Sequence, residues 1–424
     1  MKNRKLILKE LFSNDEVSGE WGEELPSETH LLRVRCIRGA DIEEAWLNKL
    51  HSAPTRYIKN KSISKLLKEN DIILEISGGS PTQSTGRAVI ITRQLLQHAK
   101  DPIVCSNFCR TLRVNNQNDP KYVFYSLQNI YRQGVFFNFE GKTTGIKNLD
   151  LKSALKSIPI IYLDFPTQQK LAAVLSALDT KIELNQRINA ELESMAKTLY
   201  DYWFVQFDFP NEKGKPYKSA GGKMVWNEAL KREIPLGWEV GTLLDIADFM
   251  NGLPCQKFRP TGSESLRVIK IREMHEGFSE NSELTRPDIP QKAIIENGDV
   301  LFSWSASLEV QIWSGGKGAL NQHIFKVTSD KYPKSFYYYQ LINYLTHFKM
   351  MSENRKTTMG HITQEHLQQS RIALPTKHLT LKLEKIIDPI FKRKTVNEID
   401  SQTLTELRDW LLPMLMNGQV RVMG

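Results

Sequence analysis

The chain repeats the order of its own segments, and this repetition constrains the fold more than any other feature. Four stretches of the first half have a counterpart in the second half, in the same order. One short match would be chance, but four in register order indicate a duplicated unit whose loops differ in length. The pairs are LRVRCIRGADI from Leu32 with LRVIKIREMHE from Leu266, ENDIILEISGG from Glu69 with ENGDVLFSWSA from Glu296, KTTGIKNLDLKSALKSIPI from Lys142 with KTTMGHITQEHLQQSRIAL from Lys356, and FPTQQ from Phe165 with LPTKH from Leu374.

Each half begins with the pattern of a mixed α/β lobe. Short apolar runs bounded by Gly, Asn and Asp predict strands. A helix follows in each half: NDPKYVFYSLQNIY, with Asp119 as N-cap and Pro120 at the first helical position, and KSFYYYQLINYLTHF, whose aromatic side chains share one face and favour core packing. The predicted strands are Leu32–Ile37, Ile72–Ile76, Ala88–Thr92, Leu266–Ile271, Val300–Trp304 and His323–Val327.

Each half ends in a long helical segment. The stretch from Ala177 to Phe204 has neither Gly nor Pro, and its apolar positions follow a heptad-like seam that is interrupted at Asn185. The C-terminal segment has a similar seam with a polar stretch at Arg393–Thr395. A helix of roughly 38 residues is about 57 Å long. We expect the two helices to pack on each other as an antiparallel pair.

Together these patterns predict an α+β fold with a pseudo-two-fold internal repeat. Two similar mixed α/β lobes would be separated by two long helices that form an antiparallel coiled coil. A linker rich in Gly and Lys, NEKGKPYKSAGGK, precedes the second lobe. The expected boundaries are a first lobe at 1–160, a central helical spacer at 161–210, the linker and second lobe at 211–375, and a C-terminal helical spacer at 376–424.

Charge and cysteine content narrow the class of protein. The net charge is +9, a mild basic excess that suits a nucleic-acid partner without requiring one. The four cysteines form no CxxC pair, which favours free thiols in a reducing cytoplasm. The apolar run in the N-terminal segment MKNRKLILKELF is too short for a signal peptide. The pattern of this segment predicts a small amphipathic helix. No apolar run reaches the roughly 18 residues of a membrane span.

The common catalytic signatures are absent from the sequence. It contains no G-x-x-x-x-G-K-[ST], no G-x-G-x-x-G after a strand, no H-E-x-x-H and no G-x-S-x-G. A dispersed active site would leave no motif, yet the sequence favours a chain that is not itself an enzyme and that binds no metal or cofactor.

Polar and basic loops are the alternative to catalytic chemistry. The loops GGSPTQSTGR, GKTTGIKN, NRKTTMGHIT and SGGKGALNQH carry side chains that bond base edges or phosphates, and Lys-Thr-Thr recurs at matching points of the two halves. Solvated loops or a structural turn would explain the same residues. The candidate DNA-contacting residues are Gln83, Ser84, Thr85, Arg87, Lys142, Thr143, Thr144, Lys147, Lys317, Gln322, Arg355, Lys356, Thr357 and Thr358.

At three places the chain resembles the specificity (S) subunit of type I restriction–modification systems. These are FPTQQKLAAVLSALDTKIELNQRINAELESMAKTLYDYWF, the restart IPLGWEVGTLLDIADFMNG, and the ending LRDWLLPMLMNGQV. The likeness covers the whole lobe–helix–lobe–helix order, and the helical segments are its specific part. The first half departs by opening with VSGEWGEELPSE instead of a copy of the restart.

The resemblance implies a division of labour. Each lobe would be a target recognition domain that reads one half of a split double-stranded DNA sequence. The helices would bind two methyltransferase (M) subunits, and restriction endonuclease (R) subunits would join them. S-adenosylmethionine, ATP and Mg would belong to those partners. An adenine to be methylated would be flipped into an M subunit.

Two other classes of function remain open from the sequence. A stand-alone DNA-binding regulator would share the basic charge and the symmetry, and would bind DNA without partners. A scaffold that bridges two protein partners would share the helices and would lack a steep salt dependence of DNA affinity.

Overall fold

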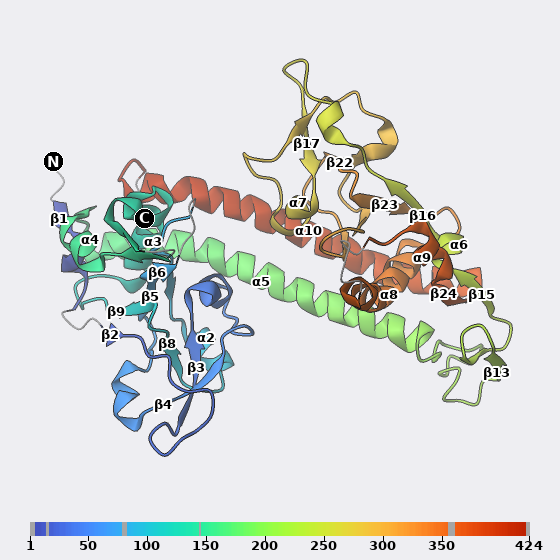
Figure 1. The fold of residues 1–424 in the computed structure, drawn as a ribbon, viewed down its shortest axis with the longest axis horizontal. Coiled ribbons are helices and arrows are strands. Elements are labelled where there is room, and N and C mark those ends of the chain that lie inside the picture. The colour runs from blue at the N-terminus through green and yellow to red at the C-terminus, as the bar shows by residue number, and fades with distance from the viewer. Residues whose placement is uncertain (1–4, 14–16, 79–82, 144–145, 355–360, 421–424) are drawn as a thin grey trace. The chain divides into compact units, whose positions relative to one another are not determined.

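A computed structural model describes residues 5–13, 17–78, 83–143, 146–354 and 361–420 of the chain. Contacts within the chain divide it into two compact units, one built from two separate stretches of sequence and the other from a single stretch. The colours of Figure 1 follow the residue numbers along the chain. Unit 1 comprises 1–183 and 403–424, and unit 2 comprises 184–402. We call the α/β part of unit 1 lobe 1 and that of unit 2 lobe 2.

A four-stranded antiparallel sheet forms the centre of lobe 1. Its order is β2-β9-β5-β7. Strand β5 is buried along its whole length, as expected for an inner strand of the sequence IILE. A second sheet has the order β4-β3-β8, in which β3 is parallel to β8, and a third has the order β10-β11-β6. The strands are β2 Val17–Ser18, β3 Leu32–Ile37, β4 Thr55–Ile58, β5 Ile72–Glu75, β6 Ser77–Gly78, β7 Ala88–Ile90, β8 Ile103–Cys105, β9 Cys109–Leu112, β10 Glu140–Thr143 and β11 Ile146–Leu149.

Helix α3 covers the central sheet of lobe 1. It spans Pro120–Arg132, and the Asp119 carboxylate accepts a hydrogen bond from the Tyr122 backbone N–H, so the predicted cap is confirmed. Most of its side chains join a core with the strands and the adjoining helical segments. The other helices of lobe 1 are α1 Ile42–Trp46, α2 Arg93–His98 and α4 Leu151–Ser157, with 3-10 turns η1 Leu8–Leu11, η2 Gly39–Asp41, η3 Asn60–Lys65 and η4 Val135–Phe139.

The prediction of an N-terminal amphipathic helix is wrong. Residues Lys5–Ile7 form strand β1, which pairs antiparallel with β12 at Pro159–Ile161, and only the single turn η1 follows. The partner strand lies more than 150 residues away in sequence, so a pattern of neighbouring residues does not show it. Strand pairing overrides local helical propensity here.

Lobe 2 repeats the sheets of lobe 1. Its central sheet has the order β16-β23-β20-β21, and a second sheet has the order β18-β17-β22-β19, in which β17 is parallel to β22. A separate hairpin of β13 and β14 precedes the lobe. The strands are β13 Met224–Asn227, β14 Arg232–Pro235, β15 Glu239–Thr242, β16 Asp248–Asn251, β17 Leu266–Ile269, β18 Leu284–Thr285, β19 Ile294–Ile295, β20 Val300–Ser303, β21 Glu309–Ile312, β22 Gly318–Leu320, β23 Ile324–Thr328 and β24 Arg371–Leu374.

The helices of lobe 2 also follow the order of lobe 1. Helix α8, Lys334–Asn354, takes the place of α3, and the predicted core role of its aromatic face is confirmed by burial of Tyr337 and Phe348. The shorter helices are α6 Leu243–Ile246, α7 Ile271–Glu276 and α9 Gln364–Gln369, with turns η5 Cys255–Lys257 and η6 Gln291–Ala293.

The shared strand order confirms the internal repeat and also locates where lobe 1 begins. In lobe 2, β15 pairs antiparallel with β24 and leads into α6. In lobe 1, β1 pairs antiparallel with β12 and leads into η1. The counterpart of the restart sequence IPLGWEVGTLLDI is therefore the segment around Lys5–Leu11, not VSGEWGEELPSE.

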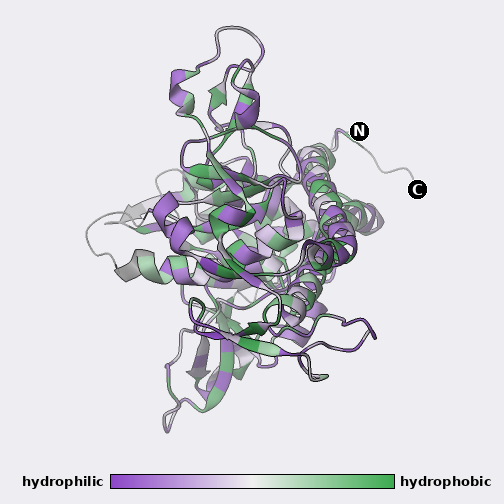
Figure 2. Cartoon of the chain, turned by 90° about the vertical axis from the view of Figure 1, so that its right-hand side faces the viewer, coloured by the Kyte–Doolittle hydropathy of each residue, from purple (hydrophilic) through white to green (hydrophobic). Residues whose placement is uncertain are grey.

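Two helices of 40 residues each continue from the lobes: α5, Phe165–Phe204, and α10, Lys377–Met416. In unit 1, Leu171 and Leu175 of α5 share a core with Leu412, Leu415 and Met416 of α10. In unit 2, Ala196 and Tyr200 share a core with Leu383, Ile387 and Phe391. The antiparallel helical pair is thus confirmed, and Figure 2 shows hydrophobic and hydrophilic residues interspersed along the long helices.

A cluster of three asparagines interrupts the apolar seam within unit 2. Asn185 is buried, and its amide donates to the Asn397 backbone oxygen at 3.4 Å. Asn397 donates to the Asn189 side-chain oxygen at 2.8 Å, and Asn189 donates to the Lys394 backbone oxygen at 3.0 Å. We call Asn185, Asn189 and Asn397 the asparagine cluster. It matches the break in the seam that the sequence predicts at Asn185.

Three further observations bear on the class of protein. All four cysteines are free and buried. Among the described residues, no group of His, Cys, Asp and Glu is arranged to hold a metal ion. Within the same part of the chain, no helix has the length and apolar character that crossing a bilayer requires.

Candidate nucleic-acid interface

Two loops of lobe 1 that the sequence singled out separately lie side by side. Strand β11 pairs with β6, so that Lys147 is opposite Gly78 and Asn148 is opposite Ser77. The Lys147 ammonium also donates to the Gln83 backbone oxygen at 3.2 Å. The structure therefore brings Gly78 and Gln83 against β11, although Gln83 and Lys147 are 64 residues apart in sequence.

Several candidates of this loop pair have partners inside the protein. Thr85 is buried, and its N–H and hydroxyl donate to the Glu140 carboxylate at 2.6 and 3.0 Å. Ser84 is buried beside it. Lys147 forms an ion pair with Glu140 at 3.2 Å and lies 4.8 Å from the centre of the Phe137 ring. These contacts hold Thr85 and Lys147 to the same carboxylate, that of Glu140.

Arg87 is the most firmly held of the candidates in lobe 1. Its guanidinium donates two hydrogen bonds to the Glu75 carboxylate, one to each oxygen, at 2.9 and 2.8 Å. This is the bidentate arrangement of an arginine–carboxylate pair. These bonds raise the pKa of the Arg87 guanidinium. Glu43 lies 3.6 Å away. Gln83, by contrast, has an exposed side chain. Contact of any of these residues with a base stays a prediction.

The duplicated Lys-Thr-Thr motif falls mostly beyond the described residues. Thr144, Arg355, Lys356, Thr357 and Thr358 lie outside them. Lys142 and Thr143 belong to β10, where Lys142 pairs with Lys147 and Thr143 with Ile146, but their side chains are outside the description.

In lobe 2 the two described candidates lie on either side of β22. Lys317 precedes the strand, is half exposed, and has Glu296 at 3.8 Å. Gln322 follows the strand, and its backbone N–H donates to the Leu253 oxygen at 2.9 Å. Its side chain contacts the exposed ring of His323. The two candidates thus lie at opposite ends of β22, and Lys317 is the more exposed of them.

Sequence reasoning missed an aromatic and histidine group next to Gln322. The Trp304 indole donates to the Asn251 side chain at 2.9 Å and lies 5.7 Å from the His323 ring and 5.3 Å from the His361 ring. His323 and His361 are exposed. The ring faces and imidazole N–H groups can stack on or bond to bases. The Trp of SWSA and the His residues of NQH and GHIT were the signal available in the sequence, but the sequence does not show that the three side chains meet.

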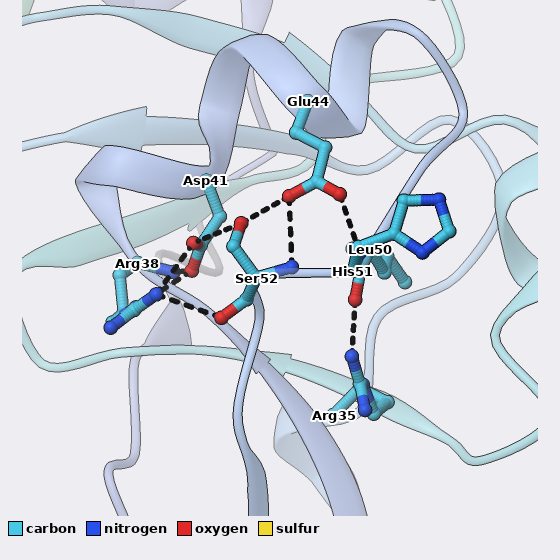
Figure 3. Close-up of polar contacts among 7 residues, drawn as sticks. All are labelled: Arg35, Arg38, Asp41, Glu44, Leu50, His51 and Ser52. Atoms are coloured by element: carbon cyan, nitrogen blue, oxygen red, sulfur yellow. Dashed lines mark hydrogen bonds and ion pairs between the residues drawn. The ribbon is translucent and has the colours of Figure 1, made fainter. Parts of the chain in front are cut away.

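A polar network holds the segment after β3 in lobe 1 (Figure 3). Arg38 donates to the Asp41 carboxylate at 2.9 and 2.8 Å and to the Ser52 backbone oxygen at 2.8 Å. Ser52 donates from its hydroxyl to Asp41 at 3.0 Å and from its backbone to Glu44 at 3.0 Å. Burial raises the pKa of Asp41, but the hydrogen bonds from Arg38 and Ser52 outweigh it and leave that pKa below its ordinary value.

Lobe 2 has the same device after β17. Glu273 is fully buried, accepts from the Lys270 backbone and from Arg272, and accepts from the Ser282 hydroxyl at 3.0 Å. In each lobe a buried carboxylate lies four residues after the end of an inner strand: Asp41 after β3 and Glu273 after β17. These carboxylates form ion pairs with Arg38 and Arg272. The positive charges of these two arginines are therefore already balanced within the protein.

Comparison with known proteins follows the same duplication. A family model described as the type I restriction modification DNA specificity domain matches residues 48–194 and again residues 235–406. The specificity subunit of the type I restriction enzyme MjaIX of Methanocaldococcus jannaschii is 26% identical over 335 residues, which cover 76% of this chain and 74% of that protein. The HindI specificity subunit of Haemophilus influenzae is 23% identical over 321 residues, or 63% of this chain and 70% of that protein.

A solved structure has the same fold. The S subunit of a type I restriction–modification system from M. genitalium aligns over 97% of this chain and 96% of its own length, with a TM-score of 0.55 and 16% sequence identity. Because the family model matches each lobe together with the helix that follows it, and most of the chain in total, the chain belongs to the type I restriction modification DNA specificity domain family.

Proposed function

We propose that this chain is the non-catalytic DNA-specificity subunit of a type I restriction–modification complex. Lobe 1 and lobe 2 are its target recognition domains, and each reads one half of a bipartite double-stranded DNA target. The helices α5 and α10 seat two methyltransferase subunits, and endonuclease subunits join for cleavage. Adenine methylation, S-adenosylmethionine, ATP and Mg²⁺ belong to those partners, and the complex acts in the cytoplasm.

The observation that carries the proposal is the match of the DNA specificity domain to both halves of the chain. The repeated strand order supports two reading modules of one kind. The exposed His323 and His361 rings beside the half-buried Trp304 support a base-reading surface on lobe 2. The four free thiols suit a reducing compartment.

The long helices offer surface for partners. They expose large apolar side chains, among them Met195 on α5 and Val396 and Trp410 on α10. Large apolar side chains that stay exposed on a helix can be buried against a partner protein. This supports the docking role of the helices and not the number of subunits bound.

Sequencing of methylated adenines tests the proposal directly. Source cells with and without this gene are compared, and deletion is expected to abolish methylation at one split motif throughout the genome. If every methylated motif survives deletion, the chain does not direct a methyltransferase. Purified protein that binds one DNA sequence specifically without partners would favour the stand-alone regulator instead.

A further inference from the structure

Unit 2 contains a pocket on the side of the helical pair where α5 ends. Its volume is about 530 Å³, within the size range of ligand pockets. The wall is formed by the last turns of α5, the middle of α8, the hairpin strand β14 and the edge of β24. All of its lining residues lie between 197 and 373, so the pocket belongs to unit 2 alone.

Only some of the charged side chains in the pocket have a hydrogen-bond or ion-pair partner. Lys197 and Asp201 form an ion pair one turn apart on α5. Arg232 and Arg371 have no hydrogen bond or ion pair from their guanidinium groups to any residue that the structure describes. The pocket therefore keeps an excess of two positive charges when His347 is neutral.

Arg232 is an exposed arginine of the pocket wall. Its guanidinium lies 5.1 Å from the centre of the Phe207 ring. Arg38 and Arg87 each donate hydrogen bonds to a carboxylate, whereas the Arg232 guanidinium has no carboxylate partner among the described residues. Such a guanidinium binds a carboxylate through two parallel hydrogen bonds.

The rest of the wall suits a peptide better than a phosphate backbone. Gln340 and Asn343 of α8 present amides that make no hydrogen bond among the described residues. An amide side chain both donates and accepts, as a peptide backbone requires. Phe204, Leu230 and Ile372 add apolar wall. A phosphodiester backbone has no hydrogen-bond donor for the amide oxygens and no aliphatic side chain for the apolar wall, whereas a peptide offers both.

We propose that this pocket binds a short peptide segment of a partner protein through an acidic side chain held by Arg232 and Arg371. Gln340 and Asn343 bond the peptide backbone, and the apolar wall takes a neighbouring aliphatic side chain. The identity of the partner rests on the proposed function, in which a methyltransferase subunit supplies the segment. The chemistry of the pocket does not depend on that identity.

Two fluorescent peptides test the pocket with purified full-length chain. One alternates Leu and Glu, and its matched control alternates Leu and Gln. Fluorescence anisotropy is expected to show at least tenfold tighter binding of the Glu peptide. Arg232→Gln and Arg371→Gln should each remove that preference, and Arg232→Lys should restore part of it. Arg259→Gln is the control, because Arg259 is exposed and has no partner among the described residues.

Equal binding of the two peptides, or unchanged preference in both variants, would overturn the proposal. Unchanged circular dichroism and melting temperature in the Arg371→Gln variant confirm that folding is intact, since Arg371 is an exposed side chain.

A second measurement uses the methyltransferase subunits and separates this inference from the proposed function. Arg232→Gln and Arg371→Gln should each weaken subunit binding about five- to twentyfold, and Arg259→Gln should not. If wild-type chain binds the Glu peptide but no methyltransferase subunit, the proposed function fails and the pocket stands. If the two variants weaken DNA binding of the assembled complex and leave subunit binding intact, the pocket holds DNA phosphate and the proposal is wrong.

Discussion

At the scale of single residues, buried carboxylates stabilise the ends of the inner strands. Asp41 has no exposed side-chain surface and receives hydrogen bonds from Arg38 and Ser52. We expect Asp41→Asn to lower the free energy of unfolding of lobe 1 by roughly 1–3 kcal/mol, because Arg38 loses its anionic partner. Urea denaturation at neutral pH measures the loss.

The pH dependence of this effect has a definite sign. The folded-state pKa of Asp41 is lowered, so its contribution is fully present above its unfolded pKa of about 3.9 and is lost as pH falls through the folded value. The difference in stability between wild type and Asp41→Asn should therefore shrink below about pH 4. Glu28→Gln, which changes an exposed carboxylate without a partner among the described residues, should show no such difference.

The asparagine cluster gives a second prediction at this scale. Asn397→Leu removes the donor to the Asn189 side-chain oxygen and should destabilise unit 2 by roughly 1–3 kcal/mol. The double variant Asn189→Leu/Asn397→Leu should lose much less than the sum of the two single variants, because neither side chain leaves a buried polar partner. A double-mutant cycle from thermal melts measures this coupling, and strict additivity would contradict it.

Residue identity predicted part of this picture. The break in the seam at Asn185 predicted a polar core position, and Asn185 is buried there. Its partners were not predictable, because the sequence of one helix does not show which turn of the other helix packs against it. The same holds for Thr85 and Arg87: the sequence shows that they can bond bases, but not that Glu140 and Glu75 hold them from inside.

At the scale of elements, the sequence predicted the interiors of strands and helices better than their exceptions. Strand β3 occupies the predicted residues, and β5 and β7 begin where predicted. Strand β1 was missed because a three-residue strand has no period of its own, and its pairing with β12 defines it. The structure identifies β1 as the counterpart of β15, because β1 pairs antiparallel with β12 in the same way that β15 pairs with β24.

The lengths of α5 and α10 give a prediction for the proposed function. Insertion of seven residues in each helix, beside the Glu193–Lys394 ion pair, keeps the apolar seam in phase. Each helix grows by about 10.5 Å, the length of about three base pairs. We expect the unread gap of the methylated motif to grow by about three base pairs while both half-sites stay unchanged. An unchanged gap would show that the helices do not set the spacing.

At the scale of the whole molecule, the repeat predicts modular specificity. Exchange of residues 1–160 for the first lobe of another family member should change one half of the methylated motif and preserve the other half. Sequencing of methylated adenines after the exchange measures both halves at once. A change in both halves would contradict the assignment of one half-site to each lobe.

The salt dependence of DNA binding is a second whole-molecule test. Phosphate contacts release counterions, so DNA affinity of the assembled complex should fall about 10³-fold or more between 50 and 200 mM salt if about six phosphates are contacted. A flat response in a filter-binding assay would favour the protein scaffold.

Unit 1 is assembled from the two ends of the described chain. Its core includes Leu412 and Leu415, and Arg408 of α10 forms an ion pair with Asp179 at 2.8 Å and lies over the Trp46 ring. During synthesis, at about 5–20 residues per second, lobe 1 emerges first but lacks these contacts until residues 403–416 have left the ribosome. Unit 2 is one continuous stretch and can close earlier. The lobe made first is thus the last to be completed, and its apolar surface depends on chaperones or on the rest of the chain for about 12 to 47 seconds.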